Sequence, residues 1–212
     1  MSFSVETFRA KLEEGGGPAF GDRYHVAFNA PSGVSFEAAS YLRGIESVAG
    51  ITTRLSWLCD TINIPSRSLT TTEFRTYGLP VKRPYGSVYT ESQMEFLCTR
   101  NMGEKKFFDA WLNYIFDNRS YDMAYYDNYT TNIDIYHFDR SVSTANDLSK
   151  STYHITLEEA YPTLVGEISM NHTASEILKI PITFTYKKYV HSDVNSVDLD
   201  AMGDANRFAS VA

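Results

Sequence analysis

The chain has 212 residues, of which 43% are hydrophobic and 21% charged, a composition typical of one globular domain with a full core rather than a disordered chain. Its formal net charge of -7 disfavours a basic surface that grips nucleic-acid phosphates. The N-terminal segment carries charges and no apolar signal-peptide core, and no stretch is apolar over the length of a membrane span, so we expect neither secretion nor a membrane partner.

The first quarter of the chain predicts a helix followed by a strand. Residues 5–14 place Val5, Phe8 and Leu12 on one side of a short amphipathic helix, and a run of three glycines ends it. Alternating apolar residues over 24–28 predict the first strand. The small residues that follow predict loop over 29–50, with one short helix near 36–44.

Residues 55–99 predict two strands separated by a long hairpin. Residues 55–64 are predicted to form the second strand, which Pro65 ends. The polar, β-prone segment from Pro65 to Gly86 is punctuated by glycine and proline and predicts a protruding hairpin. The next strand is expected over 88–99, with Met94, Phe96 and Cys98 on one face.

One strong helix is predicted over residues 102–117. Asn101 is its expected N-cap, with Glu104 three residues later as in a capping box. Its apolar stripe, at helical spacing, consists of Phe107, Phe108, Trp111, Tyr114 and Ile115. This stripe predicts the core helix of the domain.

The last third predicts four more strands, at residues 133–137, 153–157, 164–170 and 177–190. In the last of these, apolar residues take every second position from Leu178 to Tyr186, and Pro181 is expected to be tolerated only at a sheet edge or bulge. The predicted fold is mainly β with one core helix: a β-sandwich or partly closed β-barrel. The expected organisation is an N-terminal helical arm (1–19), a β domain (20–190) and an acidic C-terminal tail (191–212).

No pattern in the sequence predicts catalysis, a cofactor or a metal. The glycines of GGGPAFG follow a helix and lack the third glycine of a dinucleotide fingerprint. Neither HExxH nor CxxC occurs, the acidic tail lacks the ligands of a calcium loop, and no GxSxG elbow is present. Cys59 and Cys98 are predicted to be buried reduced thiols, and we expect the protein not to be an enzyme.

The tyrosine-rich segment 118–132 leaves three interpretations open. Its side chains could pack a local loop, cover another protein, or bind a ligand such as a sugar. Nucleic-acid stacking is disfavoured because Arg119 is the only basic residue near these rings.

The order of these features resembles the tail tube proteins of T4-like contractile-tailed bacteriophages, together with tube initiators and type VI secretion tube proteins. The segments that carry the resemblance are LCDTINIPSR, the hairpin SLTTTEFRTYGLPVKRPYG, the helix NMGEKKFFDAWLNYIF and the closing stretch from YHITLEEAYPTLVGEIS to TFTYKKY. The similarity runs from about Phe20 to Val190.

The resemblance implies a structural subunit that forms stacked homo-hexameric rings around a channel for viral DNA. Implied partners are the tail sheath, the baseplate and the tape-measure protein, in a virion tail assembled in the bacterial host cytoplasm. A baseplate tube-initiator ring is the alternative, and a carbohydrate- or receptor-binding β-sandwich is a more distant one.

In the family the long hairpin contacts the next ring. The resemblance therefore makes the inter-ring contact candidates Arg67, Phe74, Arg75, Tyr77 and Arg83. It also places the family's closing hairpin at the turn 161–163 and the strand 166–170.

Overall fold

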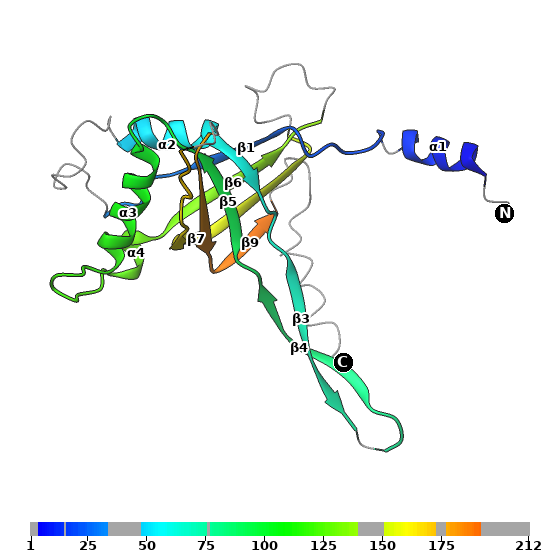
Figure 1. Ribbon diagram of the computed structural model, residues 1–212. Helices are drawn as coiled ribbons and strands as arrows, with labels where there is room; N and C mark the ends of the chain where they lie inside the picture. Colours follow the sequence, from blue (N-terminus) through cyan, green and yellow to red (C-terminus); the bar gives the residue numbers. More distant parts are fainter. Residues whose placement is uncertain are drawn as a thin grey trace. The chain divides into compact units, whose positions relative to one another are not determined.

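The computed structural model describes residues 4–14, 16–33, 48–75, 77–139, 151–172 and 177–191 (Figure 1). It divides into two compact units. Unit 1 comprises Met1–His25, Ile135–His154 and His191–Ala212, and unit 2 comprises Val26–Asp134 and Ile155–Val190. The helix expected near 36–44 and residues 192–212 of the acidic tail lie outside the described residues.

Four helices and nine strands occur in the described chain. In order they are α1 (Val5–Glu14), β1 (Tyr24–Phe28), α2 (Val48–Leu58), β2 (Cys59–Ile62), β3 (Arg67–Phe74), β4 (Val81–Tyr89), β5 (Ser92–Leu97), α3 (Gly103–Ile115), α4 (Tyr126–Tyr129), β6 (Thr131–His137), β7 (Tyr153–Val165), β8 (Lys179–Thr185) and β9 (Lys188–His191). The sequence predicted α1, β1, α3 and β6 within a few residues of these bounds.

The strands form one large sheet and one small one. The large sheet has the order β1-β6-β7-β8-β5-β2, and β9 pairs with β7 beside this path. β3 and β4 pair only with each other in the part of the chain that is described. The prediction of a mainly β fold with one core helix is confirmed, and the large sheet is open, as in a β-sandwich.

Helix α3 carries the aromatic centre of the unit 2 core. Phe107, Phe108 and Trp111 are at most 1% exposed, whereas Ile115 at the helix end is only half-buried. The Phe108 ring lies 6.0 Å from that of Phe184 on β8. The predicted stripe is therefore confirmed over its first turns, and it packs against the buried face of the sheet.

The predicted N-cap of this helix is wrong. Met102 occupies the cap position in a left-handed conformation, and it makes no side-chain capping bond. Glu104 is fully buried and instead accepts hydrogen bonds from the backbone N–H and the hydroxyl of Thr99, each at 3.0 Å. The Glu104 carboxylate thereby satisfies the hydrogen-bond donors of Thr99, in the turn before the helix. A capping box would instead have paired Glu104 with Asn101.

Strand β8 confirms the alternation of its apolar residues and corrects the expectation for Pro181. Ile180, Ile182 and Phe184 are fully buried, and Pro181 is exposed on the opposite face. β8 is an inner strand between β5 and β7, not an edge. The β7 ladder ends at Val165, opposite Ile182, and beyond it the Gly166 N–H donates to the Pro181 carbonyl. The proline is tolerated because it accepts this bond and removes no donor from the ladder itself.

Changing Gly166 to Ala is expected to destabilise unit 2. The Gly166 N–H donates to the Pro181 carbonyl at 2.8 Å, and a Cβ here would lie 2.9 Å from that oxygen and 2.6 Å from the proline Cγ. We expect a loss of about 1–3 kcal/mol in the free energy of unfolding, measured by urea titration. Gly86→Ala, in the same unit and with open space around its Cβ, is the matched control, and equal midpoints for the two variants would contradict the prediction.

The second predicted strand is largely wrong, because residues 48–58 form helix α2. Ile51 and Leu55, four residues apart, are at most 1% exposed and pack on one helix face. Only Cys59–Ile62 are extended. The expected loop at residues 48–50 is corrected by the same helix.

The strand expected over 88–99 divides between two sheets. Val88 and Tyr89 belong to β4 of the hairpin, and β5 begins at Ser92. Met94 and Phe96 share the buried face as predicted, while Cys98 lies beyond the strand.

The turn expected at residues 161–163 is also wrong, as is a separate strand over 164–170. β7 runs unbroken through Pro162 to Val165. The strand accommodates Pro162 by a register shift between Pro162 and Leu164. It also has a positive φ of 53° at Glu159. The chain thus stays extended where proline suggested a turn.

Unit 1 is held by contacts among its own segments. The Phe138 N–H donates to the Arg23 carbonyl at 3.0 Å, and the His137 ring bonds the Phe20 carbonyl at 2.8 Å. Helix α1 forms over the predicted residues but has no buried residue, and Val5 and Phe8 are 68% and 55% exposed. Its apolar side therefore faces solvent in the single chain.

Candidate assembly surfaces

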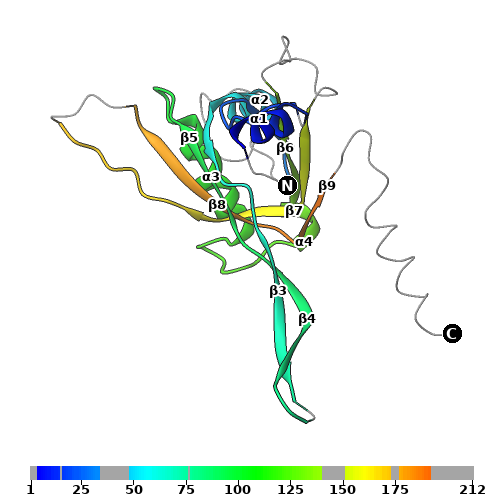
Figure 2. The ribbon, with the colours of Figure 1, turned by 90° about the vertical axis from the view of Figure 1, so that its right-hand side faces the viewer.

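The β3–β4 hairpin is the most exposed element of unit 2. Arg67 pairs with Tyr89 at its stem and Phe74 with Val81 near its tip, and the ribbon leaves the sheet as two strands alone (Figures 1 and 2). Eight residues at about 3.4 Å each give β3 a length of about 27 Å. An isolated two-stranded hairpin is marginal in water, so this one requires further contacts to be held in place.

The stem of the hairpin is anchored to the body of unit 2. The ring of Tyr89 makes edge contacts with Tyr186 at 6.1 Å and with Tyr189 at 5.2 Å. The Tyr186 hydroxyl donates to the Thr90 carbonyl at 2.6 Å, and the Thr90 N–H donates to the Ser66 carbonyl at 3.0 Å. The hairpin therefore has a fixed root and a free distal part.

The five candidate contact residues fall into two groups along the hairpin. Arg67 is at the stem, with its guanidinium 5.6 Å above the Tyr89 ring. Phe74 and Arg83 come together near the tip, where the guanidinium lies 5.1 Å above the phenyl ring. Arg75 and Tyr77 follow Phe74 at the tip, and Tyr77 is 99% exposed.

Sequence reasoning missed further exposed hydrophobic residues of the same hairpin. The large hydrophobic residues that were not among the candidates and are more than half exposed are Leu69, Leu79, Val81, Tyr85 and Val88. Tyr85 has no register partner, because the pairing shifts between Thr70 and Thr71. Apolar residues inside a segment already predicted to protrude were the signal that could have found them.

The large sheet has two open edges. Its described strand order ends at β1 and at β2. β2 is four residues long and has a register shift between Cys59 and Thr61, so the edge it offers is short. Such edges are the places where a neighbouring chain could extend the sheet.

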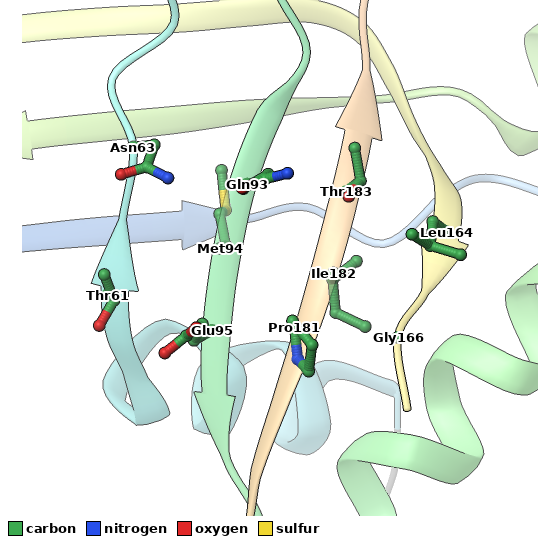
Figure 3. Close-up of a pocket in the computed structure, with 10 residues that line it drawn as sticks. All are labelled: Thr61, Asn63, Gln93, Met94, Glu95, Leu164, Gly166, Pro181, Ile182 and Thr183. Atoms are coloured by element: carbon green, nitrogen blue, oxygen red, sulfur yellow. The ribbon is translucent and has the colours of Figure 1, made fainter. Parts of the chain in front are cut away.

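The outward face of the sheet is polar and holds a small pocket. Thr61, Gln93 and Glu95 project from β2 and β5, beside Pro181 and Thr183 on β8 (Figure 3). The pocket has a volume of about 150 Å³, smaller than the ~300–1,000 Å³ of typical ligand sites. Near it the Lys179 ammonium pairs with Asp60 at 2.5 Å. The size of the pocket favours a solvated surface over a ligand site.

The tyrosine-rich segment divides between core and surface. Tyr129 is 8% exposed and packs against Tyr126 and Tyr161, with ring centroids 5.5 and 5.3 Å away. Tyr121 and Tyr125 are 75% and 84% exposed. Local packing therefore accounts for one end of the segment and not for the other.

The described residues contain no group of three or more histidine, cysteine or acidic side chains that could hold a metal. Cys59 and Cys98 are reduced thiols outside any disulfide, as predicted, but both are half-buried rather than buried. Burial, aided by the charge of Asp60, raises the pKa of Cys59 to about 12, so this thiol stays protonated and unreactive near neutral pH. None of the described helices is long and apolar enough to cross a membrane.

Solved structures with a similar fold come from contractile injection systems. A chain of the sheath/tube terminator of the extracellular contractile injection system PVC is 16% identical, with 82% of this chain and 96% of that chain covered and a TM-score of 0.53. A chain of the PVC sheath-tube complex is 17% identical over 90% and 99%, with a TM-score of 0.51. A chain of the anti-feeding prophage baseplate is 16% identical over 84% and 98%, with a TM-score of 0.53.

At these sequence identities the similar structures establish the fold alone. No curated protein sequence matches the chain significantly. The family assignment comes from the sequence itself. The family model described as phage tail tube protein matches residues 19–192, which include both open sheet edges, the hairpin and the core helix. The chain belongs to the phage tail tube protein family.

Proposed function

We propose that this protein is a non-enzymatic building block of a tail tube, in which six copies form a ring and rings stack into a hollow tube. The sheath surrounds the tube, the baseplate seeds it, a tape-measure protein sets its length, and viral DNA leaves through its channel without specific binding. The particle is a virion tail assembled in the cytoplasm of the bacterial host.

The observation that carries this proposal is the β3–β4 hairpin. Its strands pair only with each other in the described chain, while Leu79 and Tyr77 at its tip are 88% and 99% exposed. A soluble monomer gains nothing from holding such a ribbon in water. Contact with a copy in the next ring would bury it, and the two open edges of the large sheet offer a separate route to neighbours within a ring.

Two different patches that join head to tail give either a closed ring or an open stack, depending on the rotation between copies. The hairpin and the sheet edges would supply two such contacts. Electron microscopy of the purified protein tests the proposal: six-fold rings or tubes are expected. Monodisperse monomers that bind glycans would favour the carbohydrate-binding alternative.

A tube-initiator ring at the baseplate is the second candidate. The observation that favours it is the similarity to a chain of the anti-feeding prophage baseplate. Its TM-score of 0.53 is the same as that for the PVC terminator. The number of copies per particle separates the two roles, because an initiator contributes one ring and a bulk tube protein contributes many.

We further propose that the polar outward face of β2, β5 and β8 lines the channel. The other face of these strands is covered by the apolar core, and the outward face presents Glu95 and, beside β5, Glu91. Carboxylates facing DNA repel phosphates and keep the DNA moving.

Replacing Glu91 and Glu95 by Lys is expected to slow genome ejection. Each copy then presents two cations in place of two anions, and DNA should be retained on the channel wall. We expect the ejection rate to fall roughly tenfold at low salt, less at high salt, with tube length unchanged. The control places the same charge change at Glu6 and Glu13 on α1, and equal ejection rates for the two variants would refute the channel assignment.

A further inference from the structure

Residues 116–127, here called the tyrosine loop, run from the end of α3 into the first two residues of α4. The Asp117 N–H donates to the Asp122 carbonyl at 3.1 Å, and the Ala124 N–H donates to the Ile115 carbonyl at 3.0 Å. The Asp117 carboxylate accepts from the Arg119 N–H at 3.0 Å and from the Ser120 hydroxyl at 3.1 Å. The loop is thus pre-shaped by its own hydrogen bonds, which reduces the entropy cost of binding.

The loop presents an apolar surface that local packing does not use. Tyr121, Met123 and Tyr125 are 75%, 70% and 84% exposed, and Phe116, whose ring lies 6.2 Å from that of Tyr121, is 39% exposed. Tyrosine and methionine are enriched at protein interfaces, where they supply contact area at a low entropy cost. An ordered and exposed cluster of this kind indicates a protein partner.

The charges of the loop complement those of the hairpin. The loop contains Asp117, Asp122 and Asp127 against one Arg119. A backbone hydrogen bond from Arg119 and a side-chain bond from Ser120 hold the pKa of Asp117 below its ordinary value, so this carboxyl stays ionised.

The hairpin has the opposite charge. Residues 67–89 contain four basic residues and one acid, in a chain whose net charge is -7: Arg67, Arg75, Lys82 and Arg83 against Glu73. Its distal part adds exposed aromatic and aliphatic side chains to these cations. The hairpin therefore matches the loop both in charge and in apolar character.

We propose that the tyrosine loop of one copy is the docking surface for the distal part of the β3–β4 hairpin of a second copy. This inference rests on the proposed self-assembly and names the surface that receives the hairpin. Loop and hairpin are different patches of one chain, so their contact is head to tail and can repeat from copy to copy.

Disulfide trapping tests the contact directly. Leu79→Cys on the hairpin and Met123→Cys on the loop replace side chains that are 88% and 70% exposed. After assembly and mild oxidation, the double variant should give a ladder of covalent oligomers on a denaturing gel. Each single variant is the control and should remain monomeric, since the native thiols are half-buried and burial raises the pKa of each.

A charge exchange provides a second readout. Asp122→Lys and Arg83→Glu alone should each raise the protein concentration needed for tube formation by about tenfold, and the combined variant should restore much of the loss. Lys106→Glu, on the exposed side of α3, is the matched control and should assemble normally.

The outcomes separate this inference from the proposed function. Tubes of the double cysteine variant without a ladder, or no rescue in the charge exchange, would overturn the docking assignment and leave tube formation standing. Normal tubes from Tyr121→Ala/Tyr125→Ala together with lost glycan binding would overturn it too and assign the loop to sugars. Wild-type protein that forms neither rings nor tubes would overturn both.

Discussion

Shortening the β3–β4 hairpin is expected to abolish assembly while leaving the monomer folded. Ser68 and Val88 are register partners, so an Asn-Gly turn can replace residues 69–87 and close the shortened ribbon. The cut removes all the exposed apolar residues of the hairpin except Val88, together with three of the four cations, and it keeps the stem with Arg67 over Tyr89.

The monomer should tolerate this change because the removed residues form a sheet of their own. β3 and β4 pair only with each other in the described chain, and the anchoring bonds at Ser66 and Thr90 remain. We expect the melting temperature to change by less than about 4 °C, since little apolar surface of the core is exposed.

Assembly should fall by more than about 100-fold, because interface energy concentrates in a few aromatic and arginine side chains and the cut removes Phe74, Arg75 and Arg83 together. Sedimentation and electron microscopy measure it. The variant Lys106→Ala provides a surface control of normal assembly. Tubes of ordinary length and yield from the shortened protein would show that the hairpin is dispensable.

The sequence predicted best those elements whose packing has one simple period. β8 has apolar residues at every second position, and the core face of α3 repeats at helical spacing, so both could be found from the order of residues alone. The hairpin was found for another reason: glycine and proline punctuate a polar, β-prone stretch there.

Where the prediction failed, long-range packing outweighed local preference. Residues 55–58 of α2 look extended because Leu55 and Trp57 lie on either side of the polar Ser56. Leu55, however, lies four residues after Ile51, and both are buried on one helix face. β7 continues through Pro162 because it pairs with β8 both before and after the register shift, through Pro162 with Phe184 and Leu164 with Thr183. Neither effect is visible within a short window of sequence.

The sequence predicted that the hairpin is an assembly surface, but it did not predict which surface receives the hairpin. Arg83 and Phe74 could be singled out as exposed hairpin residues, but their stacking depends on the pairing of β3 with β4. Within the tyrosine-rich segment 118–132, the exposed Tyr121 and Tyr125 could not be told from the buried Tyr129, because only the fold shows which ring is buried. A surface that binds another copy leaves no periodic pattern in a single chain.

Phe108→Asp is expected to unfold unit 2. The Phe108 side chain is fully buried, with ring centroids 5.3 Å from Phe96, 5.3 Å from Phe107 and 6.0 Å from Phe184. Removing a buried phenylalanine side chain costs about 3–5 kcal/mol, and burying a carboxylate without a partner adds several more. The total reaches the ~5–15 kcal/mol that holds an ordinary domain folded.

The same helix supplies the controls for this prediction. Lys106→Asp changes an exposed position, and Lys105→Asp removes a half-exposed ion pair with Asp109 at 2.9 Å, so each should cost at most about 1 kcal/mol. Circular dichroism and urea titration should show a lost cooperative transition only for Phe108→Asp, with Phe108→Leu giving an intermediate loss of about 1–2 kcal/mol. A buried aromatic cluster cannot accommodate an unpaired charge without losing stability. A cooperative transition of Phe108→Asp near the wild-type midpoint would therefore mean that α3 is not the core helix.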